Sequence, residues 1–142
     1  MSPDEPDISL EEFDDVYGRA RIRISAQGEG RNVDVDRWLR EIVEHIDLIE
    51  RHTAHGREMF DDPDEPFSDA VEMRIVKLGH AVGELPESVR DALGATQMRA
   101  LRGMRDRLSH NYRATNLDIV WVAATRDLPA LRERVRAYLR QH

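Results

Sequence analysis

The sequence predicts an all-α protein, an up-and-down bundle of four main helices with one additional short helix. Along most of its 142 residues, apolar side chains recur at the 3.6-residue period of an α-helix. The segments with this period are joined by short connections, and hardly any stretch alternates with the two-residue period of a strand. Successive amphipathic helices with short loops pack as antiparallel neighbours, which makes a bundle the expected fold.

The first two helices are predicted from their apolar stripes and their caps. The first should begin at Asp34 or Asp36 and run to about Phe60, where an acidic, proline-containing stretch at 61–66 stops it. Ser68 should cap the second, which ends near Gly83 or Leu85. The two stripes consist of Trp38, Ile42, Ile46, Ile49, Thr53 and Phe60, and of Val71, Ile75, Leu78 and Val82.

The remaining helices are predicted in the same way. Pro86 suits the first turn of a short helix through Leu93, which Gly94 closes. Thr96 should cap a longer helix, and Asn116 should cap the last one. The last stripe keeps its phase through Pro129, so we expect one kinked helix there. The two stripes consist of Met98, Leu101, Met104 and Leu108, and of Val120, Trp121, Ala124, Leu128, Leu131, Val135 and Leu139.

Residues 1–34 are expected to form an acidic extension, flexible or loosely docked, ahead of a helical domain at residues 35–142. A short helix and a short alternating segment are plausible within it, but an isolated strand is not stable. Gly28 and Gly30 break the chain before the first main helix. The extension is therefore interpreted as a linker, or as an acidic arm that folds over a basic face and inhibits it.

Composition excludes several classes of protein. There is no cysteine, which excludes disulfide scaffolds, thiol catalysis and cysteine-bound zinc. No apolar run approaches the ~20 residues that span a bilayer, so we expect a soluble, cytoplasmic protein. The net charge is −7, which taken alone argues against nucleic acid. However, residues 90–142 carry eleven arginines and five acids, so this third is basic and could line a cleft for RNA.

The stretch 102–113 concentrates groups that can carry chemistry. Asp106 and His110 are four residues apart, so on a helix the carboxylate could accept a hydrogen bond from the imidazole. Arg105 and His110 differ by about 140° around an ideal helix, so both reach one ligand only in a cleft between elements or where the helix unwinds. The alternative is an arginine-rich, solvated helix end.

The spacing Arg105-x4-His110-x-Tyr112 resembles the signature of HEPN-domain toxins of the HepT-like group, which are partners of minimal nucleotidyltransferases. The resemblance extends from about Asp36 to His142. It includes the end of the first helix at 58–62, the second helix at 70–85 and the closing segments at 119–121 and 127–131. It implies a HEPN-type helical bundle that forms a homodimer with both motifs facing one cleft.

The resemblance also implies a function. The protein would be the toxin of a toxin–antitoxin system, an endoribonuclease that needs no metal ion or other cofactor. Arg105 would hold the phosphate and His110 would act as the base, with Asp106 and Arg102 in support. A cognate nucleotidyltransferase antitoxin would neutralise it by transferring AMP to Tyr112, placing negative charge in the path of RNA.

Two departures from the family pattern leave alternatives open. Asp106 stands where asparagine is usual, and it could repel phosphate. The chain would then be a non-catalytic HEPN module that only docks onto a nucleotidyltransferase. His80 stands where glutamate is common, and it could supply a second imidazole if its helix faces the same cleft.

A third alternative rests on three histidines of the first helix. His45, His52 and His55 span about 80° of helix surface, which could suit a histidine-ligated, metal-dependent bundle hydrolase. Only Glu41 and Asp47 are available as supporting carboxylates, so solvated or boundary histidines are the simpler interpretation.

Overall fold

The computed structural model describes residues 31–111 and 115–142, with side chains from Asp34 onward. Tyr112 and almost all of the predicted extension lie outside these residues. By its contacts the chain divides after Asp34, and the architecture below concerns the second unit, Val35–His142, together with the first turn of the helix that leads into it.

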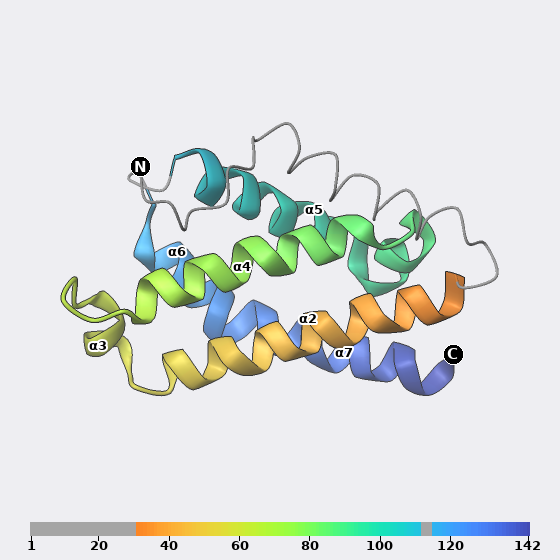
Figure 1. Cartoon of the computed structure of the whole chain (residues 1–142), viewed down its shortest axis with the longest axis horizontal. Coiled ribbons are helices and arrows are strands. Elements are labelled where there is room, and N and C mark those ends of the chain that lie inside the picture. Colours follow the sequence, from red (N-terminus) through yellow and green to blue (C-terminus); the bar gives the residue numbers. More distant parts are fainter. Residues whose placement is uncertain (1–30, 112–114) are drawn as a thin grey trace, which may run out of the picture. The chain divides into compact units, whose positions relative to one another are not determined.

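The described chain is a helical bundle without strands. Its long helices are α2 (Arg31–Thr53), α4 (Phe67–Glu84) and α5 (Glu87–His110), followed by α6 (Leu117–Val122), η3 (Ala123–Asp127) and α7 (Leu128–Gln141) as one continuous rod. Successive long helices run in alternating directions, and α5 packs along α4 (Figure 1). The predicted all-α, up-and-down bundle of four main helices is confirmed.

The core consists of the predicted apolar stripes. Ile42, Ile46 and Ile49 of α2 are fully buried, as are Ile75 and Leu78 of α4. The two tryptophans lie at the margin of this core and are only partly buried. Burial of each stripe against its neighbours supplies most of the stability of helices of this length.

The first helix ends earlier than predicted. It stops at Thr53, and a separate short helix, α3 (Arg57–Asp61), follows. Gly56 between them has φ +95°, in the left-handed region that glycine adopts without strain. Phe60 is nevertheless fully buried and lies 5.1 Å from the ring of Trp121. The buried apolar surface therefore continues from α2 to α3, although the helix itself is interrupted.

One further boundary differs from the prediction, and another agrees with it. The second helix begins at Phe67 after Pro66, and no side chain caps it, so the predicted cap at Ser68 is wrong. At Gly94 the backbone is not helical (φ +117°, ψ 96°), so α5 consists of two helical segments that meet in a kink where the short helix was expected to end. Glycine tolerates this backbone conformation, and the chain continues as a helix on both sides.

The last helix is capped as predicted, since Asn116 Oδ1 accepts a hydrogen bond from the Asp118 N–H at 2.9 Å. Its irregularity precedes Pro129 as a π-helical turn, η3, in which the Leu128 N–H donates to the Ala123 carbonyl five residues earlier. The wider turn leads into Pro129, which has no N–H to donate to a regular helix.

An ion-pair cluster ties α7 to α2. Arg132 donates through Nη1 to Asp47 at 2.9 Å, and through both terminal nitrogens to Glu50 at 2.6 Å. Its side chain is only 15% exposed. The bonds to Glu50 and then to Asp47 raise the pKa of Arg132 above its ordinary value. The first and last main helices are therefore held together by charge as well as by apolar contact.

Candidate active site

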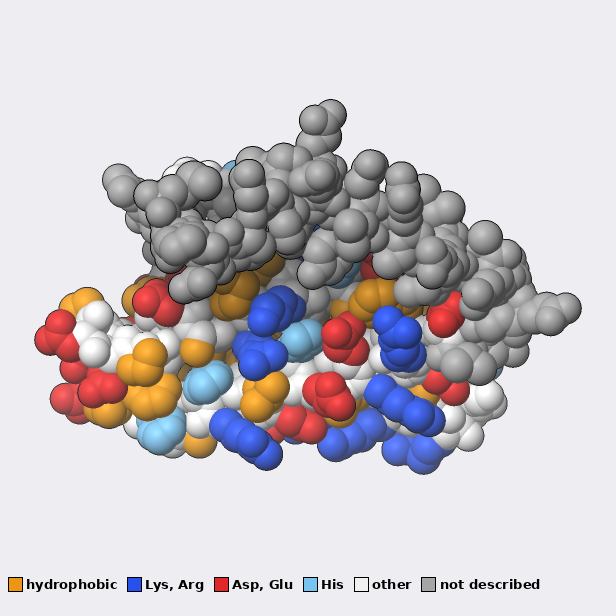
Figure 2. Space-filling view, viewed as in Figure 1, with side chains coloured by type: hydrophobic (Ala, Val, Ile, Leu, Met, Phe, Trp, Pro, Cys, Tyr) orange, Lys and Arg blue, Asp and Glu red, His pale blue; other side chains and the backbone are white. Residues whose placement is uncertain are grey.

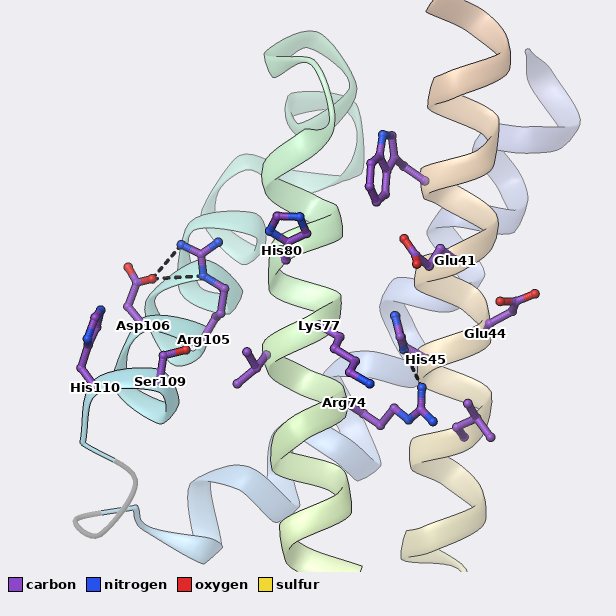
Figure 3. Close-up of a pocket in the computed structure, with 13 residues that line it drawn as sticks. Glu41, Glu44, His45, Arg74, Lys77, His80, Arg105, Asp106, Ser109 and His110 are labelled. Atoms are coloured by element: carbon purple, nitrogen blue, oxygen red, sulfur yellow. Dashed lines mark hydrogen bonds and ion pairs between the residues drawn. The ribbon is translucent and has the colours of Figure 1, made fainter. Parts of the chain in front are cut away.

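A pocket of about 830 Å³ lies among α2, α4 and α5 (Figure 3). Each helix contributes to its lining. The residues from α2 are Trp38, Glu41, Glu44, His45 and Leu48; those from α4 are Arg74, Val76, Lys77 and His80; those from α5 are Arg105, Asp106, Ser109 and His110. The pocket is therefore assembled from segments up to about half the chain apart, and it includes most of the predicted motif.

The position of Arg105 depends on a close approach of α5 to α4. A β-carbon added at Gly79 would lie 2.6 Å from Cβ of Arg105 and 3.1 Å from its Cγ and Cδ. One turn further along α4, a β-carbon at Gly83 would lie 3.8 Å from Nη1 of the same arginine. Only glycine at position 79 lets the stem of Arg105 lie directly against α4 and project its guanidinium into the pocket.

Asp106 binds the guanidinium of Arg105. Oδ1 accepts hydrogen bonds from Nε at 3.1 Å and from Nη2 at 2.8 Å. These bonds are the main reason why the pKa of Asp106 lies below its ordinary value, with smaller contributions from the charges of Arg105, His110 and Arg102. Helical spacing had suggested a hydrogen bond from the His110 imidazole to Asp106, but the structure shows Asp106 bonded to Arg105 instead.

The remaining motif residues take different positions. His110 is the last residue of α5, and it lines the same pocket as Arg105. The cleft required by their angular separation is therefore present. Arg102 is partly buried but does not line the pocket, so its support is limited to its charge near Asp106. Tyr112 lies outside the described residues.

The described lining of the pocket is not basic, in contrast to what the charge of residues 90–142 suggested. Among the described residues it has three cations and three carboxylates, together with three histidines. On the face in Figure 2, Lys and Arg side chains are interspersed with Asp and Glu. The cations are Arg74, Lys77 and Arg105, and the carboxylates are Glu41, Glu44 and Asp106. Any anion bound here must compete with carboxylates for these cations.

The three histidines of the proposed metal alternative do not converge. His45 is buried at the pocket wall, and its Nδ1 lies 3.4 Å from Nη1 of Arg74. Burial is the main cause of its lowered pKa. His55 stacks on Phe67 at 4.2 Å and His52 lies 6.3 Å from the same ring. Nowhere in residues 31–111 and 115–142 do three or more His, Asp or Glu side chains form a group able to hold a metal ion.

His80 was an open candidate in the sequence, and its helix does face the pocket. The ring lies edge-on to Trp38, with centroids 6.2 Å apart, and Nε2 is 3.6 Å from Oε1 of Glu84. Arg74 and Lys77 also line the pocket, although sequence reasoning did not select them. They lie six and three residues before His80 on the same helix, and this spacing could have indicated that they share its side of the helix.

Known proteins resemble a large part of the chain. A family model described as "Ribonuclease HepT-like" matches residues 42–138, which include all the residues named in the pocket lining except Trp38 and Glu41. No solved structure matches the chain. No helix in the described part of the chain is long and apolar enough to cross a membrane.

Three curated relatives are each similar to about 70% of the chain. A protein of Methanocaldococcus jannaschii named "Gamma-glutamylcyclotransferase and putative RNase" is 31% identical over 102 residues, which are 72% of this chain but only 46% of that protein. A "Putative RNase" of Caldanaerobacter subterraneus subsp. tengcongensis is 28% identical, over 73% of this chain and 93% of its own length. A second "Putative RNase" of M. jannaschii is 26% identical, over 70% and 83%.

Proposed function

The chain belongs to the HepT-like ribonuclease family, and we propose that it is an endoribonuclease in which Arg105 and His110 cleave RNA without a metal ion. The observation that carries this proposal is that the two side chains, separated around α5, line one pocket between three helices. The two relatives that the chain spans most fully are both named for RNase activity.

The chemistry needs few protein groups because RNA supplies its own nucleophile, the 2′-hydroxyl. Cleavage requires a base to remove the hydroxyl proton and a cation to stabilise the charge that develops on the phosphate. The His110 imidazole can act as the base near neutral pH. The guanidinium of Arg105, whose side chain is 28% exposed in the pocket, can bind phosphate oxygens in a fork.

Asp106 determines how readily phosphate reaches Arg105. Its two hydrogen bonds use two of the five N–H groups that a guanidinium carries. A phosphate can therefore bind to the remaining donors, but it does so against the charge of the carboxylate. We interpret Asp106 as holding Arg105 in its rotamer while weakening its hold on RNA.

The regulatory part of the proposal rests on the motif alone. The protein would be the toxin of a toxin–antitoxin pair in the cytoplasm, and a nucleotidyltransferase would inactivate it by adding AMP to Tyr112. The added phosphate, two residues beyond His110, would compete with RNA for the cations of the pocket. Intact-mass analysis after coexpression with a cognate nucleotidyltransferase should detect the addition of AMP, and Tyr112→Phe should abolish it. Addition that persists in the variant would contradict the assignment.

A homodimer is also proposed, because a two-fold partner would bring a second copy of the motif to a shared cleft. Protomers carrying Arg105→Ala and protomers carrying His110→Ala should then recover part of the activity when mixed. A failure of recovery despite proven subunit exchange would mean that each chain works alone.

The direct test is cleavage of RNA by the purified full chain in excess EDTA. The wild type should cleave, while Arg105→Ala and His110→Ala should lose at least about 100-fold in rate. His55→Ala, which changes a histidine outside the pocket, is the matched control. Absence of wild-type cleavage would favour the non-catalytic docking module, and cleavage that EDTA stops would favour a metal-dependent hydrolase.

A further inference from the structure

The pocket contains a second imidazole beside Arg105 that the motif does not include. His80 follows Gly79 on α4, the residue against which the stem of Arg105 packs. His80 and His110 lie on opposite sides of the Arg105 side chain, one on α4 and the other at the end of α5 (Figure 3). An anion bound by Arg105 would therefore have an imidazole on each side.

The surroundings of His80 limit its motion without covering it. Trp38 from α2 contacts the ring with its edge, and Glu84, one turn further along α4, lies at ion-pair distance from Nε2. The side chain remains 41% exposed. An imidazole held between an aromatic ring and a carboxylate, and open to the pocket, can exchange a proton with a bound substrate.

Cleavage of RNA requires two proton transfers at two different oxygens. The 2′-oxygen forms a bond to phosphorus as its proton leaves, and the bond from phosphorus to the 5′-oxygen breaks as that oxygen gains a proton. The two oxygens lie on opposite sides of the phosphorus, so one imidazole cannot serve both. The products are a 2′,3′-cyclic phosphate and a 5′-hydroxyl, with no net change in protons.

We propose that His80 is the general acid of this reaction, with His110 as the base. The inference rests on the proposed function and adds to it the group that protonates the leaving oxygen. The ring of His80, with Nε2 3.6 Å from Oε1 of Glu84, faces the pocket from α4, whereas His110 is exposed at the end of α5.

The test compares His80→Gln with His110→Gln on two RNA substrates, one normal and one with sulfur in place of the 5′-bridging oxygen. The thiolate leaves without protonation, so it needs no acid. On normal RNA, both variants should lose at least about 100-fold in kcat with little change in KM. On the sulfur substrate, His80→Gln should cleave at nearly the wild-type rate, and His110→Gln should remain inactive. His55→Gln controls for the substitution itself.

The pH profile provides an independent measurement. The wild-type rate should follow a bell, and His80→Gln should lose the alkaline limb, at which the acid deprotonates. Glu84 pairs with His80 on α4, and the other titratable groups that line its pocket are Arg74 and Lys77 from α4, Glu41, Glu44 and His45 from α2, and Arg105, Asp106 and His110 from α5. Binding of an RNA that lacks the 2′-hydroxyl should be unchanged in His80→Gln, which would show that its pocket remains folded.

Each outcome has a distinct meaning. If the wild type cleaves and His80→Gln cleaves normal RNA within about threefold of it, or if sulfur does not rescue the variant, His80 is not the acid. If the wild type cleaves neither substrate, the proposed function itself fails.

Discussion

Gly79→Ala should separate the packing of the site from its chemistry. The new methyl group would lie 2.6 Å from Cβ of Arg105, whereas two carbons in contact are ~3.5–4.0 Å apart. Because that Cβ is fixed to the backbone of α5, α4 and α5 must separate by about 1 Å or Arg105 must change its rotamer. Overpacking of this kind costs ~1–3 kcal/mol, against which alanine gains ~1 kcal/mol over glycine in a helix.

The variant should therefore be destabilised by only about 0–2 kcal/mol, but its activity should fall much further. A catalytic group displaced by ~1 Å can cost about 100-fold in rate. We expect a loss of this order in the rate of RNA cleavage, with helical content retained by circular dichroism. Thermal unfolding measures the first quantity, and single-turnover cleavage measures the second.

The matched control is Gly103→Ala, which lies on α5 and has no atom within 4 Å of the added methyl. It should gain stability from helix propensity and keep its activity. Gly83→Ala, whose methyl would lie 3.8 Å from Nη1 of Arg105, should also keep nearly all of its cleavage activity and thermal stability. If Gly79→Ala matched Gly103→Ala in both measurements, the close approach of α4 and α5 would not be what positions Arg105.

Three further predictions follow from the contacts of Asp106, His45 and Arg132. Asp106→Asn should raise the cleavage rate about threefold at low salt, because it removes the negative charge that competes with phosphate for Arg105. An unchanged or lower rate would show that the carboxylate assists catalysis. The pKa of His45 is lowered by burial, so the unfolded chain binds a proton more readily than the folded chain as pH falls through 6.5, and stability falls. The drop in Tm from pH 7.5 to 5.5 should therefore be smaller in His45→Gln. An equal drop would mean that another group causes the loss of stability. Arg132→Ala should lower the free energy of unfolding in urea by about 1–2 kcal/mol, because it removes the ion pairs between α2 and α7. A change below about 0.3 kcal/mol would mean that hydration of Asp47 and Glu50 replaces these ion pairs at no cost.

The helices were predictable because the signal for each is local. The period of the apolar stripe is written into a short segment, and so is the cap at Asn116. The boundary at Thr53 was missed because the stripe stayed in phase across a turn, and Phe60 is buried from a separate helix. Periodicity records which residues are buried, not whether the backbone between them is continuous.

The site was predictable only in part. Arg105 and His110 were selected through the resemblance to a family, since their angular separation alone did not require a common pocket. The opposite wall, with His45, Arg74 and Lys77, depends on how α2 and α4 rotate toward each other, which no local pattern reports. Because the sequence does not report how helices rotate toward each other, it also did not predict the charge of the pocket lining. A count over residues 90–142 does not say which way each arginine points, and among the arginines of that segment that the structure describes, only Arg105 lines the pocket.

The π-helical turn η3 sets a rule for how the length of the last helix can change. The buried residues Val120 of α6, Ala124 of η3 and Leu128 of α7 span eight residues over two turns, whereas two regular turns hold about 7.2. Deleting one residue from Ala123–Asp127 would return the segment to a regular helix with both ends in register. It would also bring the ring of Pro129 against the carbonyl four residues earlier, at a cost of ~3 kcal/mol. A homologue shorter by one residue here should therefore have lost the proline as well.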